Sequence, residues 1–149
     1  PRMAHLFPDR RIRLNWLCWM FFQKGTALLY SGQEWENDHR PDLFDADPIP
    51  MEGTAPLEGL IRRLTALKKE PIFARGAYSL QACPNNVLLA AWKEEGRRLT
   101  GAFCLRGAPS LVSVELPDGR YENLLEPEKT LRVESGLLAL DGTPAVLEG

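Results

Sequence analysis

This sequence lacks three features that would each place a protein in a particular class: paired cysteines, a long apolar run and an excess of charge of one sign. Its three cysteines are an odd number at no metal-ligand spacing, which predicts free thiols and a cytosolic protein. The most apolar run, Trp16 to Phe22, is far shorter than the roughly 18 residues that a membrane-spanning helix needs. The formal net charge of −2 offers no field for a polyphosphate. We therefore expect a globular protein with no membrane or nucleic acid partner, and a neutral or small polar ligand.

The sequence has only two histidines and shows no secretion signal at its start. His5 and His39 stand alone, without the ligand set that a metal requires, so we expect no metal site and no cofactor. The start of the chain has no charged stretch followed by an apolar segment and a cleavage site. Because the first residue is Pro1 and no initiator Met precedes it, we expect a piece of a longer chain.

The first third of the sequence predicts a helix followed by a buried strand. The helix begins near Asp9, a good N-cap, and ends before Gly25. From Trp16 onward it is apolar on every side, so neighbours must surround it. The next segment, Thr26 to Tyr30, is short and apolar and lies between two glycines, which favours a strand buried on both faces.

A long polar loop and a second helix come next. The stretch from Gln33 to Gly53 contains three prolines and predicts a long loop. Loops of this length in compact domains are usually functional. Thr54 and Pro56 are helix start signals, an apolar stripe follows them, and Pro71 ends the helix.

After Gly76 the pattern changes to short apolar runs separated by turn residues. Strands at this spacing indicate a compact antiparallel sandwich or barrel. We therefore predict two domains, 1–74 and 75–149, and an α+β fold for the chain. The predicted strands are Ala77 to Ala82, Val87 to Lys93, Leu99 to Leu105, Leu111 to Leu116, Arg120 to Leu124, Thr130 to Glu134 and Leu137 to Leu140.

One stretch resembles a known family. GTALLYSGQE, Gly25 to Glu34, is similar to the eighth barrel strand of the α-amylase superfamily, glycoside hydrolase family 13, with its pattern G-x-P-x-x-Y-Y-G-x-E. Two positions depart from that pattern: Ala27 replaces the proline and Ser31 the second tyrosine. The resemblance continues through HRPDLFDADPI at 39–49 and LEGLIRRLTALKKEPIFARGAY at 57–78, and the rest resembles the small β-sandwich that follows such barrels.

The resemblance implies the end of a (β/α)8 barrel, a helix, strand, long loop and helix, followed by an all-β antiparallel sandwich. It also implies a parent that cleaves or transfers α-glucosidic bonds of starch-like substrates or malto-oligosaccharides by a retaining mechanism. In this family the seventh strand ends in an Asn-His-Asp motif with an arginine a few residues later, and Arg2 matches that arginine. The catalytic carboxylates would then lie upstream, and this chain alone would be inactive.

Four residues are candidates for substrate binding in the intact parent: Arg2, Gln33, Glu34 and Trp35. The last three follow the predicted strand directly and would reach the face where β/α barrels have their active sites. There Trp35 could stack on a pyranose ring, and Arg2 could orient a catalytic carboxylate. Alternatively Glu34 holds the barrel rim through buried hydrogen bonds, Trp35 only packs, and Arg2 belongs to a disordered terminus.

Other readings concern the charged residues. Six carboxylates of the long loop could supply a catalytic pair, although solvated or turn-capping roles are more usual. We expect solvated helix faces for the arginines of the first helix and for the basic residues of the second. The loop carboxylates are Glu34, Glu36, Asp38, Asp42, Asp45 and Asp47, and the basic residues are Arg10, Arg11, Arg13, Arg62, Arg63, Lys68 and Lys69.

The sandwich has two alternative roles. Trp92, Tyr78 and Tyr121 could form a noncatalytic sugar-binding platform, or the domain could be purely structural with Trp92 packed against the last barrel helix. Without a barrel, the run Trp16 to Phe22 would forgo on the order of 10 kcal/mol of burial. We therefore expect the first helix and the segment after it to pack on the sandwich or on a second copy, which makes a homo-oligomer possible.

Overall fold

The computed structural model describes residues 2–42 and 44–149. Pro1 and Leu43, the latter within the family-like stretch 39–49, lie outside the described residues. The helical elements are α1 (Met3–Leu6), α2 (Arg10–Phe22), the 3-10 turn η1 (Gln33–Trp35), α3 (Glu58–Lys68), α4 (Ile72–Arg75) and the 3-10 turn η2 (Pro84–Asn86). Among the described residues, no helix is long and apolar enough to cross a bilayer.

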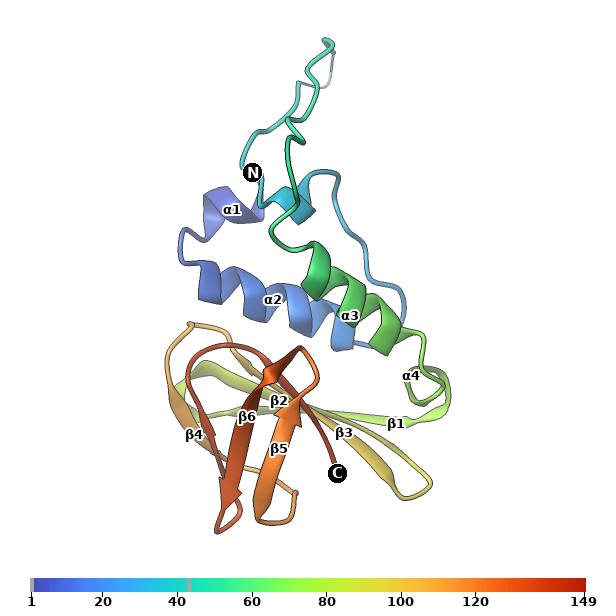
Figure 1. Cartoon of the computed structure of the whole chain (residues 1–149), viewed down its shortest axis with the longest axis vertical. Coiled ribbons are helices and arrows are strands. Elements are labelled where there is room, and N and C mark those ends of the chain that lie inside the picture. The colour runs from blue at the N-terminus through green and yellow to red at the C-terminus, as the bar shows by residue number, and fades with distance from the viewer. Residues whose placement is uncertain (1, 43) are drawn as a thin grey trace.

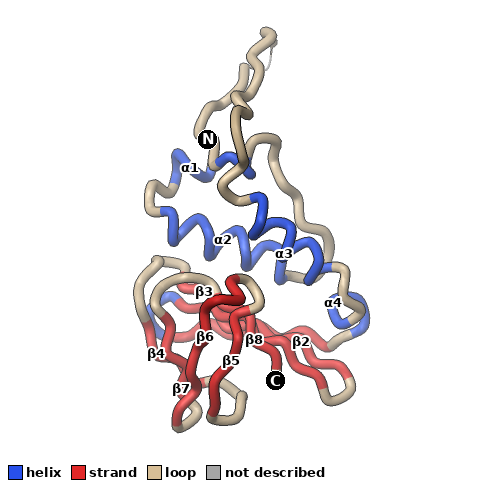
Figure 2. Tube along the Cα trace, in the orientation of Figure 1, coloured by secondary structure: helices blue, strands red, loops and turns tan. Residues whose placement is uncertain are grey.

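The predicted first helix is confirmed as α2, which runs across the top of the sandwich with α3 beside it (Figure 1). Its N-cap is Asp9, whose Oδ1 accepts a hydrogen bond from the Arg11 amide at 2.8 Å. The predicted second helix is confirmed as α3, although the chain continues past Pro71 into the single turn α4. From η1 to α3 the chain leaves the body as a projecting loop (Figures 1 and 2).

The predicted strand over Thr26–Tyr30 is wrong, because the structure has no strand there. A β-strand is held by hydrogen bonds to a neighbouring strand, and no described residue forms a strand beside this segment. The segment is instead an extended connection whose Leu28 side chain is 78% exposed. Its apolar residues Ala27 and Leu29 still pack against the core that the helices share with the first sheet.

The sandwich consists of two four-stranded antiparallel sheets, in the orders β1-β2-β3-β8 and β4-β7-β6-β5. The seven predicted strands are confirmed with boundaries shifted by a few residues, and an eighth closes the first sheet. The strands are β1 (Ala77–Cys83), β2 (Val87–Glu94), β3 (Arg97–Cys104), β4 (Ser110–Ser113), β5 (Gly119–Asn123), β6 (Glu126–Glu134), β7 (Leu137–Leu140) and β8 (Ala145–Glu148).

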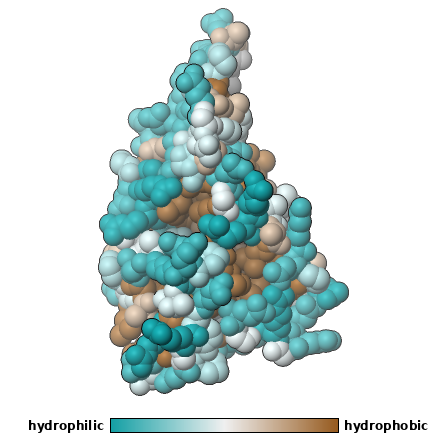
Figure 3. Space-filling model, in the orientation of Figure 1, coloured by the Kyte–Doolittle hydropathy of each residue, from teal (hydrophilic) through white to brown (hydrophobic). Residues whose placement is uncertain are grey.

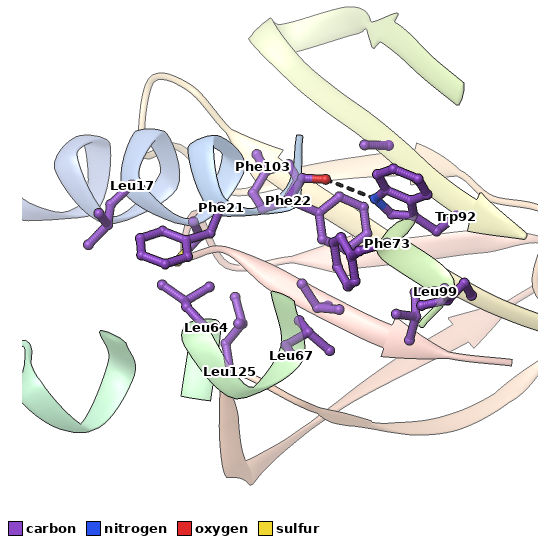
Figure 4. Packing of buried hydrophobic residues seen from close by; sticks show 14 of the residues in the cluster. Leu17, Phe21, Phe22, Leu64, Leu67, Phe73, Trp92, Leu99, Phe103 and Leu125 are labelled. Carbon is purple, nitrogen blue, oxygen red and sulfur yellow. Dashed lines mark hydrogen bonds between the residues drawn. The ribbon is translucent and has the colours of Figure 1, made fainter. Parts of the chain in front are cut away.

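The first sheet is covered on both faces, by the helices on one side and by the second sheet on the other. Side chains alternate along β2: Val87 and Leu89 face the second sheet, and Ala90 and Trp92 face the helices. Figure 4 shows the helical side, where Trp92 packs beside Phe22 and Phe73, and its Nε1 donates to the Phe22 carbonyl at 2.8 Å. Trp92 is 1% exposed and cannot form a sugar platform; it packs instead, with contacts to Phe22 of α2, Phe73 of α4 and Tyr78 of β1.

Close approach of α2 to β3 depends on a glycine. A Cβ at Gly101 would lie 2.7 Å from the Phe103 ring and 3.1 Å from Phe22, so a larger residue would push the helix away.

The molecular surface has an apolar region in the middle of the face shown in Figure 3, with polar regions above and below it.

A buried amide connects the helix to the sandwich. Asn15 of α2 is 0% exposed; its Nδ2 donates to the Gly142 carbonyl at 2.9 Å and to the Arg11 carbonyl at 2.8 Å. Its Oδ1 accepts from the backbone N–H of Cys104 at the end of β3, at 2.6 Å. One side chain therefore satisfies backbone groups of the helix, of β3 and of the turn before β8.

Replacing this amide should destabilise the whole fold. We expect Asn15→Ala to lower the free energy of unfolding by about 3 kcal/mol, because it leaves buried backbone groups of Cys104 and Gly142 without partners. Urea unfolding monitored by tryptophan fluorescence measures the change. The control is Asn37→Ala, which removes hydrogen bonds made only to His39 and Pro50 of the projecting loop. Equal midpoints for Asn15→Ala and the unmodified chain would contradict this role.

Candidate functional site

A cavity of about 390 Å³ lies between the start of the helical layer and the base of the projecting loop. Apolar side chains such as Leu17 and Leu57 form part of its wall. Polar side chains from three segments far apart in sequence form the rest. They are Arg2, Arg13, Gln33, Glu36, Asn37 and Arg40.

Arg2 lies at this cavity with most of its hydrogen-bonding capacity unused. Its Nη1 donates to the Ser31 carbonyl at 2.6 Å, and its guanidinium lies over the Tyr30 ring, 5.0 Å from the centroid. Its Nε and Nη2 are buried and have no hydrogen-bond partner among the described residues. Because guanidinium donors match the geometry of a carboxylate, Arg2 is suited to hold an acidic group or sugar oxygens.

Gln33 reaches the cavity because the chain turns sharply at Gly32. This glycine has φ +81°, and a Cβ there would lie 2.6 Å from the Ile49 side chain, so only glycine fits. The Gln33 side-chain oxygen accepts from the Tyr30 amide at 3.1 Å. The same turn begins η1 and directs Gln33 toward the cavity, which brings two of the four candidate residues, Arg2 and Gln33, together.

The other two candidates, Glu34 and Trp35, do not line this cavity. Trp35 donates from Nε1 to the Glu52 carbonyl at 3.1 Å, closing the base of the projecting loop. The backbone carbonyl of Glu34 accepts from the Leu57 amide at 3.1 Å, where the chain enters α3. Both residues therefore secure the base of the loop.

Glu36 is the charged centre of the cavity wall. Its carboxylate pairs with Arg10 at 2.7 Å and with Arg13 at 2.9 Å, and only 15% of its side chain is exposed. Burial by itself would raise the pKa of Glu36, but the hydrogen bonds and charges of the two arginines outweigh burial and lower the pKa below its usual value. The ion pairs fasten the loop to the first turn of α2.

The expectation of a solvated face is therefore wrong for Arg13. Its side chain is 17% exposed, and besides Glu36 it donates to the carbonyls of Phe7 and Pro8. The spacing of the helix arginines did not reveal this, because their partner lies 23 residues away in an irregular loop. Arg62, by contrast, is exposed and pairs only with Glu58 one turn earlier.

The remaining loop carboxylates that form contacts stabilise turns. Asp47 accepts from the Asp42 amide at 2.9 Å and contacts the His39 ring at 2.8 Å, and Asp42 accepts from the amides of Phe44 and Asp45. With Glu36 paired to two arginines, the loop presents no two carboxylates poised as a catalytic pair among these contacts. In the described part of the chain, no group of three or more acidic, His or Cys residues could hold a metal ion.

Comparison with known proteins finds a family model and solved structures that this chain resembles. Residues 79–147 match the model of the bacterial alpha amylase C-terminal domain. The crystal structure of an α-amylase from Lactobacillus plantarum is 30% identical to the chain, with a TM-score of 0.90; the match covers 99% of this chain and 35% of that one. A search of curated proteins gave no significant match.

Two more distant structures share the fold. A maltogenic α-amylase from Thermotoga neapolitana has 19% identity and a TM-score of 0.85 over 100% of this chain and 38% of its own. An α-amylase from Geobacillus thermoleovorans, solved with acarbose, has 17% identity and a TM-score of 0.67 over 94% of this chain and 33% of its own. The chain thus spans between a third and two fifths of the length of these proteins.

Removing the charge of Glu36 should change stability in a pH-dependent way. Because the folded-state pKa lies below the ordinary value of 4.5, this carboxylate stabilises the fold above that pH and loses its effect as the pH falls through the folded-state pKa. We expect Glu36→Gln to be less stable than the unmodified chain by about 2 kcal/mol at pH 7, with the difference shrinking below about pH 4. Urea unfolding between pH 3 and pH 7 measures it.

The control is Glu58→Gln, which removes an exposed pair with Arg62 and should change stability by less than about 0.5 kcal/mol. A Glu36→Gln difference that stayed constant with pH would contradict the assigned ion pairs.

Proposed function

We propose that the whole protein cleaves or transfers α-glucosidic bonds. The reason is that this chain belongs to the α-amylase superfamily (glycoside hydrolase family 13), as the C-terminal part of one of its proteins. The likeness to the Lactobacillus plantarum α-amylase, 30% identical over 99% of this chain, is the observation that supports this most strongly. The substrates would be starch-like glucans or malto-oligosaccharides, and one structure with the same fold was solved with acarbose.

In this proposal residues 1–74 are the end of a β/α barrel catalytic domain and residues 75–149 are the C-terminal β-sandwich domain. The extended segment Thr26–Tyr30 would become the last barrel strand once a neighbouring strand lies beside it. Its two contacts with the core, through Ala27 and Leu29, leave Leu28 exposed for such a neighbour.

The proposed chemistry is retaining glycoside hydrolysis, which needs two carboxyl groups about 5 to 5.5 Å apart. Those carboxyl groups would be supplied by the barrel upstream, because Glu36 is paired with Arg10 and Arg13 and the carboxylates of Asp42 and Asp47 accept hydrogen bonds within turns of the loop. The chain alone would therefore be inactive.

The chain's own contribution would be substrate binding and positioning. Arg2, with two buried and unpartnered nitrogen atoms, would hold a carboxylate of the barrel or sugar hydroxyls, and Gln33 would add a hydrogen bond beside it. Trp35 and Glu34, at the base of the same loop, would form the rim of the sugar cleft.

A structural role for the sandwich is the second candidate, and burial of Trp92 favours it over sugar binding. Affinity electrophoresis in gels containing soluble starch separates these two: retarded migration of the 149-residue chain would indicate a binding module. We expect no retardation.

The assay for the main proposal compares this chain with a protein extended upstream from the same gene. We expect reducing sugar to be released from maltoheptaose or pullulan only by the longer protein, and the substrate it prefers would identify the linkage. A folded but silent longer protein would contradict the proposal. Activity of the short chain would mean that its loop carboxylates form a catalytic pair.

Within the longer protein, Arg2→Ala should lower kcat/KM at least tenfold, because its guanidinium would position a group at the cleft. The matched control is Arg62→Ala, which removes an exposed arginine paired only with Glu58 and should leave kcat/KM unchanged. Equal kcat/KM values for the two variants would exclude Arg2 from the site.

A further inference from the structure

The four edges of the two sheets differ in how they are protected against pairing with another chain. Exposed edge strands present unpaired backbone N–H and C=O groups, and proteins usually cover them, shorten them, bulge them or place charges on them. The edges here are β1 and β8 in the first sheet and β4 and β5 in the second.

Three of these edges are protected. The free side of β8 is covered, because the Val146 amide donates to Asn123 Oδ1 at 3.1 Å and the Val146 carbonyl accepts from the Leu124 amide at 2.9 Å. Strand β5 has charges at Arg120 and Glu122 and a register shift at its end. Strand β4 has only four residues.

Strand β1 has none of these protections. Its seven residues, AYSLQAC, contain no charge and no proline, in a chain of which 26% of the residues are charged. Its pairing with β2 is unbroken from Ala77–Lys93 to Cys83–Val87, so no bulge turns the edge away. None of the seven residues is buried, and Leu80 in the middle is 47% exposed.

The two faces of β1 have different chemistry. Tyr78, Leu80 and Ala82 lie opposite Trp92, Ala90 and Leu88 of β2, so they are on the helical side of the sheet. Ser79 and Gln81 lie on the other side, opposite Ala91 and Leu89. The strand therefore has one apolar face and one uncharged face, on which Ala77 and Cys83 flank the two polar residues.

We propose that β1 pairs antiparallel with β1 of a second copy of this chain, across a two-fold axis at Leu80. This register uses all seven residues and keeps each face matched, because a two-fold axis perpendicular to the sheet preserves its faces. Leu80 meets Leu80 of the copy and Tyr78 meets Ala82 on the apolar face, whereas Ser79 meets Gln81 on the polar face. With no charge on the strand, no like-charge pair opposes the contact.

The resulting dimer has a continuous eight-stranded sheet, four strands from each copy. The contact runs along β1, which distinguishes it from association through the exposed Leu28 of the extended connection or the exposed Phe44 of the projecting loop. Because one strand pair is a small interface, we expect association in the micromolar range.

Sedimentation equilibrium of the 149-residue chain from about 5 to about 200 µM tests the proposal. We expect the mean mass to rise from monomer to dimer, and Leu80→Lys to weaken the dimer at least tenfold, because two lysines would face each other across the axis. Two control variants, Leu28→Lys in the extended connection after α2 and Leu111→Lys on β4, replace leucines that are 78% and 58% exposed and should leave dimerisation unchanged.

Cross-linking tests the register of the β1–β1 pair directly, without a substitution that weakens the dimer. In a Cys83→Ser background, Leu80→Cys should form an intermolecular disulfide with oxidised glutathione, because opposite Cα atoms of antiparallel strands lie about 4.5 to 5.5 Å apart. Leu111→Cys in the same background is the control and should cross-link far more slowly.

A monomer at all concentrations would overturn the proposal. The edge of β1 would then be available for pairing with a strand of another protein. Dissociation by Leu28→Lys rather than Leu80→Lys, or equal cross-linking at positions 80 and 111, would also overturn it.

Discussion

The structure depends on the buried amide of Asn15, which joins α2 to the end of the first sheet where β3 ends and the chain enters β8. Apolar packing alone would hold the helix over β3, but such packing is non-directional and tolerates sliding. The hydrogen bonds of Asn15 to Cys104 and Gly142 select one position along the helix axis. The bond from Trp92 to the Phe22 carbonyl adds a second fixed point at the other end of α2. The first turn of the same helix is thereby placed where Arg13 can meet Glu36.

The cavity follows from this placement. It is not built into the sandwich but formed where the start of the chain, α2 and the base of the projecting loop meet. Glu36 has positive φ, 54°, a conformation that is unfavourable for its residue type, and its two ion pairs offset that disadvantage. Arg2 by contrast is held by one carbonyl and one ring, which leaves its other nitrogen atoms available to a group beyond these segments.

Sequence patterns revealed the regular elements and the family but not the contacts between them. The bounds of β2 were within reach of the sequence, and its residues then divide between two cores because successive side chains in a strand point to opposite faces. The segment Thr26–Tyr30 has the composition of a buried strand, yet a strand needs a neighbour, which composition cannot reveal. The partnership of Arg13 with Glu36 was also out of reach, since it depends on the path of a loop without periodicity. Of the proposed site residues, the structure brings Arg2 and Gln33 to one cavity; their role in binding stays a prediction.

The long-range bonds of Asn15 also affect how this protein folds as it is made. Its partner Gly142 lies 127 residues further along the chain. At about 5 to 20 residues per second, a ribosome needs about 6 to 25 s to add that length, whereas a helix forms in about a microsecond. For the first part of this interval α2 has no sheet beside it, and until β8 is made the first sheet lacks its last strand. Nascent chains would therefore depend on chaperones, or on upstream parts of their own protein, until the last strand emerges.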